Sequence, residues 1–384
     1  MHPDTALFAG RKNYRIAVSS LFFLSGLCFS TWAARIPSIQ QQLHLSDAGL
    51  GAVLLALPVG LMVSLPLAGW LVAKYGSRNI VISAAILYAC TLPFIGFVQQ
   101  TWQLMAVLSL FGLGGNLLNI SMNTQGVGVE SIYGRSILAS LHGIWSLAGF
   151  FGAAIGTIMI SQHISPYNHF MIIAGVALLI ILSAWSFTLK ADSNTNSNQP
   201  IFARPDKSLI NLGLIAFCCM ICEGAMFDWS GVYFQKVVKA KQAWIGAGYT
   251  AFMSTMAAGR FVADWMVTRF GIKKILQTSG IVIASGLSLA ILLPHIATSI
   301  AGFILVGAGV SSVVPLIYSA AGKSKEVSPG VALAAVSTIG YLGFLIGPPV
   351  IGFIAEVSSL RVSFVLIALL GLTTTLVATR TKWQ

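Results

Sequence analysis

The sequence predicts an all-α membrane protein with about twelve transmembrane helices. Apolar residues make up 56% of the 384 residues, only 8% are charged, and the mean hydropathy is +0.85. Soluble domains carry roughly 25% charged residues, so the polar remainder here is too small to cover a water-exposed surface. Because each span needs about 20 apolar residues plus a connection, a chain of this length has room for roughly twelve spans.

Apolar runs between polar breaks predict the individual spans. The longest polar interruption, 190–208, follows the sixth run and is expected to be a cytoplasmic linker. It divides the chain into two predicted six-helix bundles, 1–189 and 209–384. The bases ahead of the first run resemble those of a signal peptide, but the run is too long for one and is interpreted as a retained span. The predicted spans are 15–34, 47–67, 79–98, 102–123, 136–160, 168–189, 209–235, 243–266, 273–294, 297–319, 328–354 and 358–379.

The positions of the basic residues predict the orientation of the chain in the membrane and argue against nucleic acid as a partner. With a cytoplasmic N-terminus, sixteen Lys and Arg residues fall on the inside and five, Arg35 among them, on the outside. This bias places both termini in the cytoplasm, as expected for a bacterial inner-membrane protein. The net charge of +12 does not indicate nucleic-acid binding, because the bases punctuate the gaps between spans instead of gathering on one face.

No pattern for a cofactor or for catalysis is evident. The five cysteines lie inside apolar runs, and Cys219-x-x-Cys222 has no second pair of ligands, so packing is expected in place of a metal site. The sequence contains no phosphate-binding Gly-x-x-x-x-Gly-Lys-Ser/Thr motif. We therefore expect no metal, no cofactor and no enzymatic activity.

The two halves of the chain share matching residues at a nearly constant offset. The segment 75–78 matches 270–273 at an offset of 195 residues, Gly149 matches Gly343 at 194, and Trp32 matches Trp229 at 197. Three matches at nearly one offset indicate a duplicated six-helix unit with pseudo-symmetric halves. Many transporters build a midplane site between such repeats.

The loop after the second span carries a recognisable motif. Gly69-Trp-Leu-Val-Ala73-Lys74-Tyr-Gly76-Ser-Arg78 resembles the loop motif of the major facilitator superfamily, with Ala73 in place of its acid. The second half keeps an acid in the corresponding stretch, Asp264. The resemblance implies the major facilitator fold and a cytoplasmic brace for the closed state. The gating residues that it implies in these two loops are Gly69, Lys74, Gly76, Arg78, Arg260, Asp264 and Arg269.

Three further segments, 32–37, 223–229 and 340–349, resemble a branch of that superfamily related to fucose permease. The branch implies secondary transport of a small solute. Drug–proton antiporters of the superfamily usually have an Arg in span four and a Gly-Pro motif in span five. Span four has no charge before Glu130, and Gly149-Phe-Phe-Gly152 lacks the proline. Efflux is therefore the second hypothesis.

Two carboxylates inside span seven are candidates for proton coupling. An ionisable group in a bilayer costs at least about 2.5 kcal/mol, so such groups are functional candidates by default. We predict that Glu223 carries the proton, with a purely structural role as the alternative. Asp228 lies five residues later, on a different face, and is predicted to meet Arg35 and close the outer gate. The alternative is that the two are separately solvated interfacial charges.

Polar and aromatic residues of the central spans are candidates for binding the solute. Asn116, Asn119 and Asn123 lie at i, i+3 and i+7 of span four, which predicts one polar face directed into the bundle. Hydrogen bonding between helices is the alternative. In span five, His142 is a candidate proton relay or substrate ligand, or else a structural histidine. Trp32, Trp145 and Trp229 are candidates for stacking on a sugar face, and Trp32 and Trp229 alternatively belong to an interfacial aromatic belt.

Gly347-Pro348-Pro349 is predicted to interrupt span eleven and to let a moving helix bend, with a static kink as the alternative. Together these features favour a monomeric, proton-coupled importer of a small polar solute, a sugar or sugar-like compound first, working by alternating access. Proton-driven efflux of an amphipathic compound is the alternative.

Overall fold

The computed structural model describes residues 3–134, 137–190, 207–322 and 329–381, and every regular element in these ranges is helical. Each of the twelve predicted spans coincides with helix, so the predicted fold class is confirmed. Two spans are split into helix pairs, at Leu55 and at Ser311–Ser312. The elements are α1 (Pro3–Gln42), α2 (Asp47–Leu54), α3 (Ala56–Tyr75), α4 (Ser77–Phe97), α5 (Thr101–Tyr133), α6 (Leu138–Ser161), α7 (Pro166–Trp185), α8 (Lys207–Lys236), the 3-10 turn Gln242–Trp244, α9 (Ala247–Phe270), α10 (Ile272–Leu292), α11 (Ile296–Val310), α12 (Val313–Ala321), α13 (Pro329–Val357) and α14 (Leu360–Arg380).

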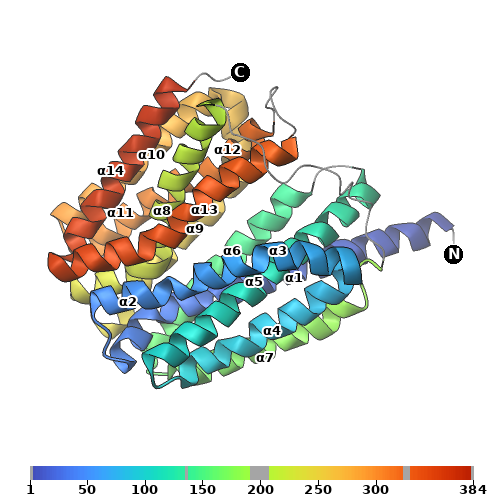
Figure 1. Cartoon of the computed structure of the whole chain (residues 1–384), viewed down its shortest axis with the longest axis horizontal. Coiled ribbons are helices and arrows are strands. Elements are labelled where there is room, and N and C mark those ends of the chain that lie inside the picture. The colour runs from blue at the N-terminus through green and yellow to red at the C-terminus, as the bar shows by residue number, and fades with distance from the viewer. Residues whose placement is uncertain (1–2, 135–136, 191–206, 323–328, 382–384) are drawn as a thin grey trace. The chain divides into compact units, whose positions relative to one another are not determined.

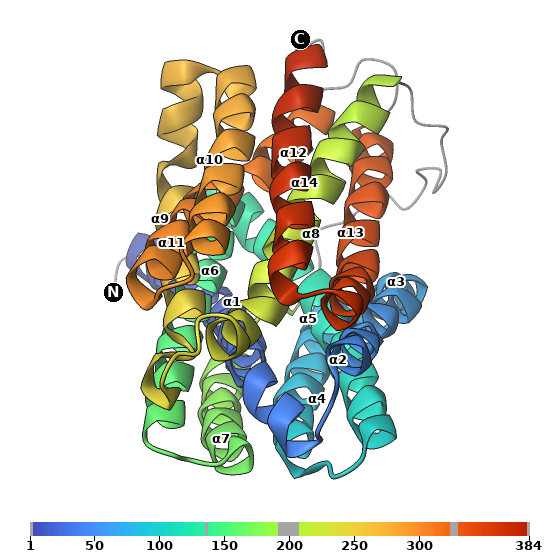
Figure 2. The ribbon, with the colours of Figure 1, turned by 90° about the vertical axis from the view of Figure 1, so that its left-hand side faces the viewer.

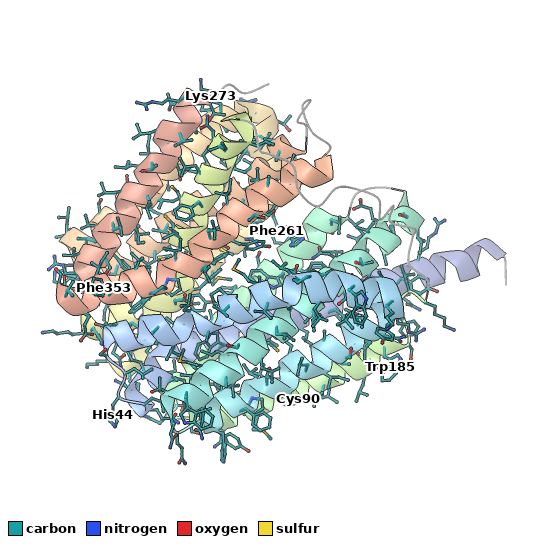
Figure 3. The ribbon with its side chains drawn as sticks, in the orientation of Figure 1. His44, Cys90, Trp185, Phe261, Lys273 and Phe353 are labelled. Atoms are coloured by element: carbon teal, nitrogen blue, oxygen red, sulfur yellow. The ribbon has the colours of Figure 1, made fainter. Side chains whose placement is uncertain are left out.

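Eleven helical segments within the described ranges are long and apolar enough to cross a membrane. The remaining predicted span, 243–266, forms α9, which carries Arg260 and Arg269 along its length. Large apolar side chains lie exposed on the helices, among them Trp185 and Phe353, which are labelled in Figure 3. Such exposure is expected where lipid is the surrounding medium, because lipid tails are as apolar as these side chains.

Several helices extend beyond their predicted ends, and α1 and α5 are two examples. The first was expected to end near residue 34, with Arg35 on the outside, but α1 continues to Gln42 and Arg35 is 2% exposed. The fourth was expected to end near residue 123, but α5 continues to Tyr133 and ends on Gly134 in the left-handed conformation. In both cases a buried polar residue past the predicted end forms a hydrogen bond, Arg35 with His169 and Gln125 with Ser77, so it does not end the helix.

The described residues form two compact units. Unit 1 holds 3–43, 56–134 and 137–190, and unit 2 holds 44–55, 207–322 and 329–381. The short helix α2 therefore groups with unit 2, although it precedes α3 directly in the chain. The predicted linker lies almost entirely in 191–206, outside the described residues.

Close backbone contacts hold the helices of unit 1 together. Helix α1 packs on α6 and α7, α3 packs on α5, and α4 packs on α5 and α7 (Figure 1). A Cβ atom on Gly60 would lie 1.9 Å from the Ser109 carbonyl oxygen, and one on Gly112 would lie 2.0 Å from the Leu57 carbonyl oxygen. Glycine is required at both positions because α3 and α5 touch backbone to backbone.

Unit 2 repeats this packing 195 residues later. Helices α9, α10 and α11 run side by side (Figure 2), and α8 packs on α13 and α14. Gly307 corresponds to Gly112, and its Cβ would lie 2.2 Å from the carbonyl oxygen of Phe252, the counterpart of Leu57. The counterpart of Gly60 is Thr255, whose hydroxyl donates to the Ile304 carbonyl at 2.8 Å. The internal duplication therefore extends to individual helix contacts.

The two motif loops also share one backbone conformation. Gly76 has φ 80° and ψ 147°, and Gly271 has φ 76° and ψ 151°, values that are essentially restricted to glycine. Trp70 and Tyr75 meet edge to face at 6.2 Å, and their counterparts Trp265 and Phe270 do the same at 6.1 Å. The repeated turn thus ends one long helix and starts the next in each unit.

Polar contacts fasten α2 within unit 2. The Glu356 carboxylate accepts from the backbone N–H groups of Asp47 (2.9 Å) and Ala48 (3.2 Å), which caps the first turn of α2. The Asp47 carboxylate in turn pairs with Lys236 at 2.6 Å. A Cβ on Gly51 would lie 2.7 Å from the Pro348 carbonyl oxygen, so α2 and α13 touch along their backbones.

Candidate functional site

A buried ion pair joins α8 and α9 in unit 2. Arg260 Nη2 lies 3.4 Å from Glu223 Oε1, and the two side chains are 17% and 9% exposed. The sequence places Glu223 in this setting because α8 is apolar on nearly every side, and all residues from Cys218 to Phe227 other than Glu223 itself and Gly224 are apolar and buried. A charge there needs a partner, and Arg260 supplies it.

Two half-buried tyrosines, Tyr318 on α12 and Tyr341 on α13, lie in the same region of unit 2. Tyr318 and Tyr341 both lie within electrostatic range of Glu223, and Tyr318 has a side-chain hydrogen bond with Ser337. This region therefore contains one carboxylate, one guanidinium and two phenol groups, which come from four helices. Such a set can hold a proton, exchange it, or donate hydrogen bonds to a polar solute. Sequence reasoning missed both tyrosines, because nothing in their spacing relates them to span seven.

Arg260 was predicted to act as a gating residue alongside Asp264. The structure places Glu223 next to it, in a hydrogen-bonded ion pair. The side chain of Asp264 lies outside the described residues, so its predicted role stays a prediction. Arg269 is exposed in the last turn of α9.

Asp228 and Trp229 lie one turn further along α8. Asp228 is half-buried, while Trp229 is 0% exposed and its Nε1 has no hydrogen-bond partner among the described residues. Trp32 in α1 is likewise 1% exposed. Neither tryptophan lies at a surface, so the interfacial-belt interpretation of Trp32 and Trp229 is wrong. Their predicted contact with a solute stays a prediction.

The three asparagines of α5 do not share one environment. Asn116 is buried and its Nδ2 donates to Ser64 Oγ at 2.8 Å, which joins α5 to α3. Asn119 is exposed and Asn123 is half-buried. The Nδ2 of Asn123 donates to the backbone oxygen of Asn119 at 2.8 Å and approaches the Oδ1 of Asn119 at 3.4 Å. Asn116 therefore holds helices together, and only Asn119 and Asn123 are accessible to a solute.

The α6 candidates lie beside α1. His142 is exposed and meets the Phe22 ring edge to face at 5.3 Å. Trp145 is half-buried, with its ring tilted against Phe29 at 6.0 Å. Both side chains are at least partly exposed, in contrast to Trp32, whose side chain is covered.

Arg35 forms a polar cluster that sequence reasoning missed. Its Nε donates to His169 Nδ1 at 3.1 Å, and its Nη2 donates to the Ile164 carbonyl at 2.8 Å. His169 is 0% exposed, and its Nε2 has no partner among the described residues. No sequence signal pointed to this cluster, because Arg35 was expected outside the membrane and His169 lies 134 residues away in the chain. Because Asp228 belongs to unit 2, the predicted pairing of Arg35 with Asp228 stays a prediction.

The motif loop of unit 1 is fastened by aromatic and carbonyl contacts. Lys74 Nζ lies 4.7 Å from the Trp70 ring centroid and 5.2 Å from that of Tyr75, while Arg78 Nη2 donates to the Trp185 carbonyl at 3.3 Å. Gly69 is exposed, with nothing near its Cβ position. Lys74, the neighbour of Ala73, thus makes cation–π contacts with two aromatic rings. The motif of the superfamily has an acid at the position of Ala73.

The prediction that Pro348 and Pro349 interrupt span eleven is wrong. Helix α13 runs without a break from Pro329 to Val357, with both prolines inside it. Each proline removes one backbone N–H, but the contact with α2 at Gly51 packs this part of the helix. The residues therefore shape a helix contact, and their predicted role in bending stays a prediction.

The chain is similar along nearly its whole length to known proteins. The family model of the Major Facilitator Superfamily matches residues 18–324 and 240–383. An MFS-type transporter of Yersinia pestis is 33% identical over 94% of this chain and 93% of its own length. The nucleoside transporter NupG aligns with a TM-score of 0.77 at 14% identity, over 96% of this chain and 99% of its own. A mutant of the E. coli fucose:proton symporter FucP aligns with a TM-score of 0.62 at 19% identity, over 96% of this chain and 98% of its own. The chain therefore belongs to the Major Facilitator Superfamily of membrane transporters.

Proposed function

We propose that this transporter couples the import of a small polar solute to protons, with Glu223 as the proton-carrying group. The observation that carries the proposal is the buried Glu223–Arg260 pair. When a proton binds Glu223, the charge that holds Arg260 disappears and the pair loosens. A group that is charged in one state and neutral in another can couple proton movement to an alternating-access cycle.

The solute class rests on the polar and aromatic groups that remain accessible. The exposed amide of Asn119 offers both donors and acceptors, which suits a hydroxylated or amide-bearing compound. Half-buried Trp145 provides a flat apolar face for a sugar ring. A sugar or sugar-like solute is therefore favoured. Nucleosides, which combine a sugar with a flat base, belong in the same test because they present both features.

The orientation and assembly are part of the same proposal. Both termini face the cytoplasm of a bacterial inner membrane, and the transporter works as a monomer. The excess of Lys and Arg in the loops on the side of the termini supports this orientation.

The solute is identified first, by thermal shift of the purified protein. The panel contains sugars, sugar acids, nucleosides, amino acids and lipophilic cations, each at two pH values. A ligand present at about 100 times its dissociation constant adds roughly 2.7 kcal/mol of stability to the folded protein. A sugar-class or nucleoside hit that is weakened in Asn119→Ala supports the import proposal. A hit confined to lipophilic cations overturns it in favour of efflux.

Proton coupling is then tested in proteoliposomes loaded with that solute. Glu223→Gln should abolish accumulation driven by a pH gradient while counterflow exchange persists, because the amide cannot release a proton. The matched control is Glu356→Gln, whose amide oxygen can still accept from the Asp47 and Ala48 N–H groups. Retained pH-driven accumulation in Glu223→Gln would show that another group carries the proton.

A further inference from the structure

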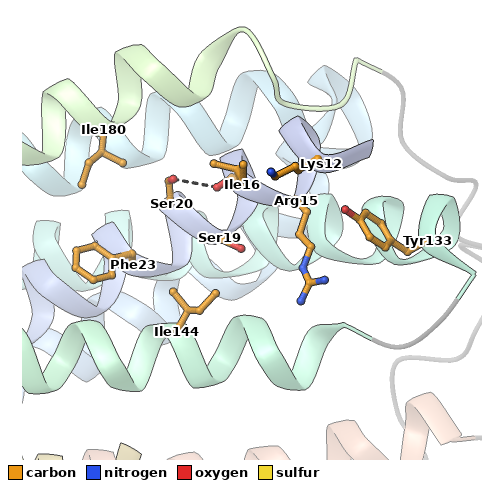
Figure 4. Close-up of a pocket in the computed structure, with 9 residues that line it drawn as sticks. All are labelled: Lys12, Arg15, Ile16, Ser19, Ser20, Phe23, Tyr133, Ile144 and Ile180. Carbon is orange, nitrogen blue, oxygen red and sulfur yellow. Dashed lines mark hydrogen bonds between the residues drawn. The ribbon is translucent and has the colours of Figure 1, made fainter. Parts of the chain in front are cut away.

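A groove in unit 1 is lined by none of the residues that we assign to transport. It has a volume of about 610 Å³ and lies between α1, α6 and α7, with one contribution from the end of α5 (Figure 4). One end of the groove is basic and the other end is apolar. The lining residues are Lys12, Arg15, Ile16, Ser19, Ser20, Phe23, Tyr133, Ile144 and Ile180.

The polar end is basic. Lys12 and Arg15 both line it, and none of the nine lining residues is acidic. Arg15 is held in place, because its guanidinium carbon lies 5.5 Å from the Tyr133 ring centroid and its Nη2 donates weakly to Ser140 Oγ at 3.4 Å. The Tyr133 hydroxyl is anchored on the Arg11 carbonyl at 3.3 Å. Two neighbouring cations without a lining carboxylate favour an anionic ligand.

The apolar end continues onto the exposed side of the helices. Ile16 is 53% exposed, and the ring of Phe23 lies 6.3 Å from that of Phe151, which is 44% exposed. Ile144 and Ile180 form the opposite walls, on α6 and α7 (Figure 4). The groove thus opens onto apolar surface of the kind that a membrane protein turns toward lipid tails.

We propose that this groove binds an anionic phospholipid, with its phosphate against Lys12 and Arg15 and an acyl chain along Ile16, Phe23, Ile144 and Ile180. A free phosphate would leave the apolar half unused, and a zwitterionic lipid would bring its own cation against the two bases. Juxtamembrane bases on the cytoplasmic side attract anionic lipids, and the predicted orientation puts this end of α1 there. The bound lipid would stabilise the contact of α1 with α6 and α7.

The test is a lipid titration of the intact, detergent-purified protein, followed by native mass spectrometry. The probes are dioleoyl phosphatidylglycerol, dioleoyl phosphatidylcholine and soluble glycerol phosphate. Wild type should bind phosphatidylglycerol preferentially. Lys12→Gln/Arg15→Gln should bind it roughly 30-fold more weakly, at about fivefold per base. The control Lys273→Gln/Lys274→Gln removes two exposed bases of unit 2 and should bind as wild type does.

Each contrary outcome is distinct. Equal binding by wild type and Lys12→Gln/Arg15→Gln overturns the site, and an equal loss in the unit 2 control reduces it to general surface charge. Phosphatidylcholine binding as tightly as phosphatidylglycerol overturns the anionic headgroup. Glycerol phosphate binding as tightly as the lipid overturns the acyl-chain half. If the double variant fails to fold, the single variant Lys12→Gln, which changes an exposed side chain, should still show the fivefold loss.

Discussion

Removing one member of the Glu223–Arg260 pair should destabilise the protein far more than removing both. With Nη2 and Oε1 3.4 Å apart, the attraction is about 5 kcal/mol at an effective dielectric constant near 20. The desolvation of both groups offsets most of this, so the intact pair adds little net stability. Losing one partner leaves the other charge buried, at a cost of about 3–5 kcal/mol.

The direction of each single effect follows from the chemistry. Glu223→Gln should cost more than Arg260→Gln, because a guanidinium cannot give up its proton whereas a carboxylate can take one up. The double variant Glu223→Gln/Arg260→Gln should be less destabilised than Glu223→Gln alone, so the coupling free energy of the pair should exceed the loss in Arg260→Gln.

The assay is reversible unfolding of the detergent-solubilised protein by sodium dodecyl sulfate, followed by tryptophan fluorescence, on wild type and the three variants. The control pair is Asp47 with Lys236, whose side chains are 16% and 41% exposed, and its coupling should stay below about 1 kcal/mol. Strictly additive losses for Glu223→Gln and Arg260→Gln would refute the reasoning, because they would mean that the two groups do not interact.

Three further predictions concern other positions in the structure. Gly271→Ala should cost about 1–3 kcal/mol of unfolding free energy, because its φ of 76° is strained for alanine although nothing lies near its Cβ position. Asn116→Ala should lower stability by about 1–3 kcal/mol through its lost bond to Ser64, whereas Asn119→Ala should leave stability within about 0.5 kcal/mol and reduce solute affinity instead. His169→Ala should destabilise by about 1–3 kcal/mol, since the Arg35 guanidinium loses its acceptor between α1 and α7.

Thermal or denaturant unfolding checks each of these. The control for Gly271→Ala is Gly175→Ala, because nothing lies near the Cβ position of Gly175 either and this glycine is inside a helix. Gly175→Ala should leave stability unchanged or raise it. A loss equal to that of Gly271→Ala would contradict the explanation by backbone conformation. Unchanged stability of Asn116→Ala would mean that the contact between α5 and α3 contributes nothing. His169→Asn offers a smaller acceptor for Arg35, and an unfolding free energy no better than that of His169→Ala would count against the hydrogen bond.

The sequence alone determined the number of spans and the internal duplication. Both follow from local properties, since the length of apolar runs is fixed by bilayer thickness and the repeat is visible as matched residues at one offset. Gly76 and Gly271 were matched at the same offset, and the structure shows that both adopt a positive φ that suits glycine.

The partners of the buried polar groups were decided only by the tertiary structure. Arg260 was predicted to belong to a loop brace, and its pairing with Glu223 depends on how α8 and α9 pack. Arg35 was predicted to lie outside the membrane, but the fold brings His169 to it from 134 residues away. Helical spacing put Asn116 and Asn119 on one face, yet the neighbouring helix α3 covers only Asn116. Periodicity states which residues share a side of a helix, while the contacts between helices decide which of them are buried, paired or accessible.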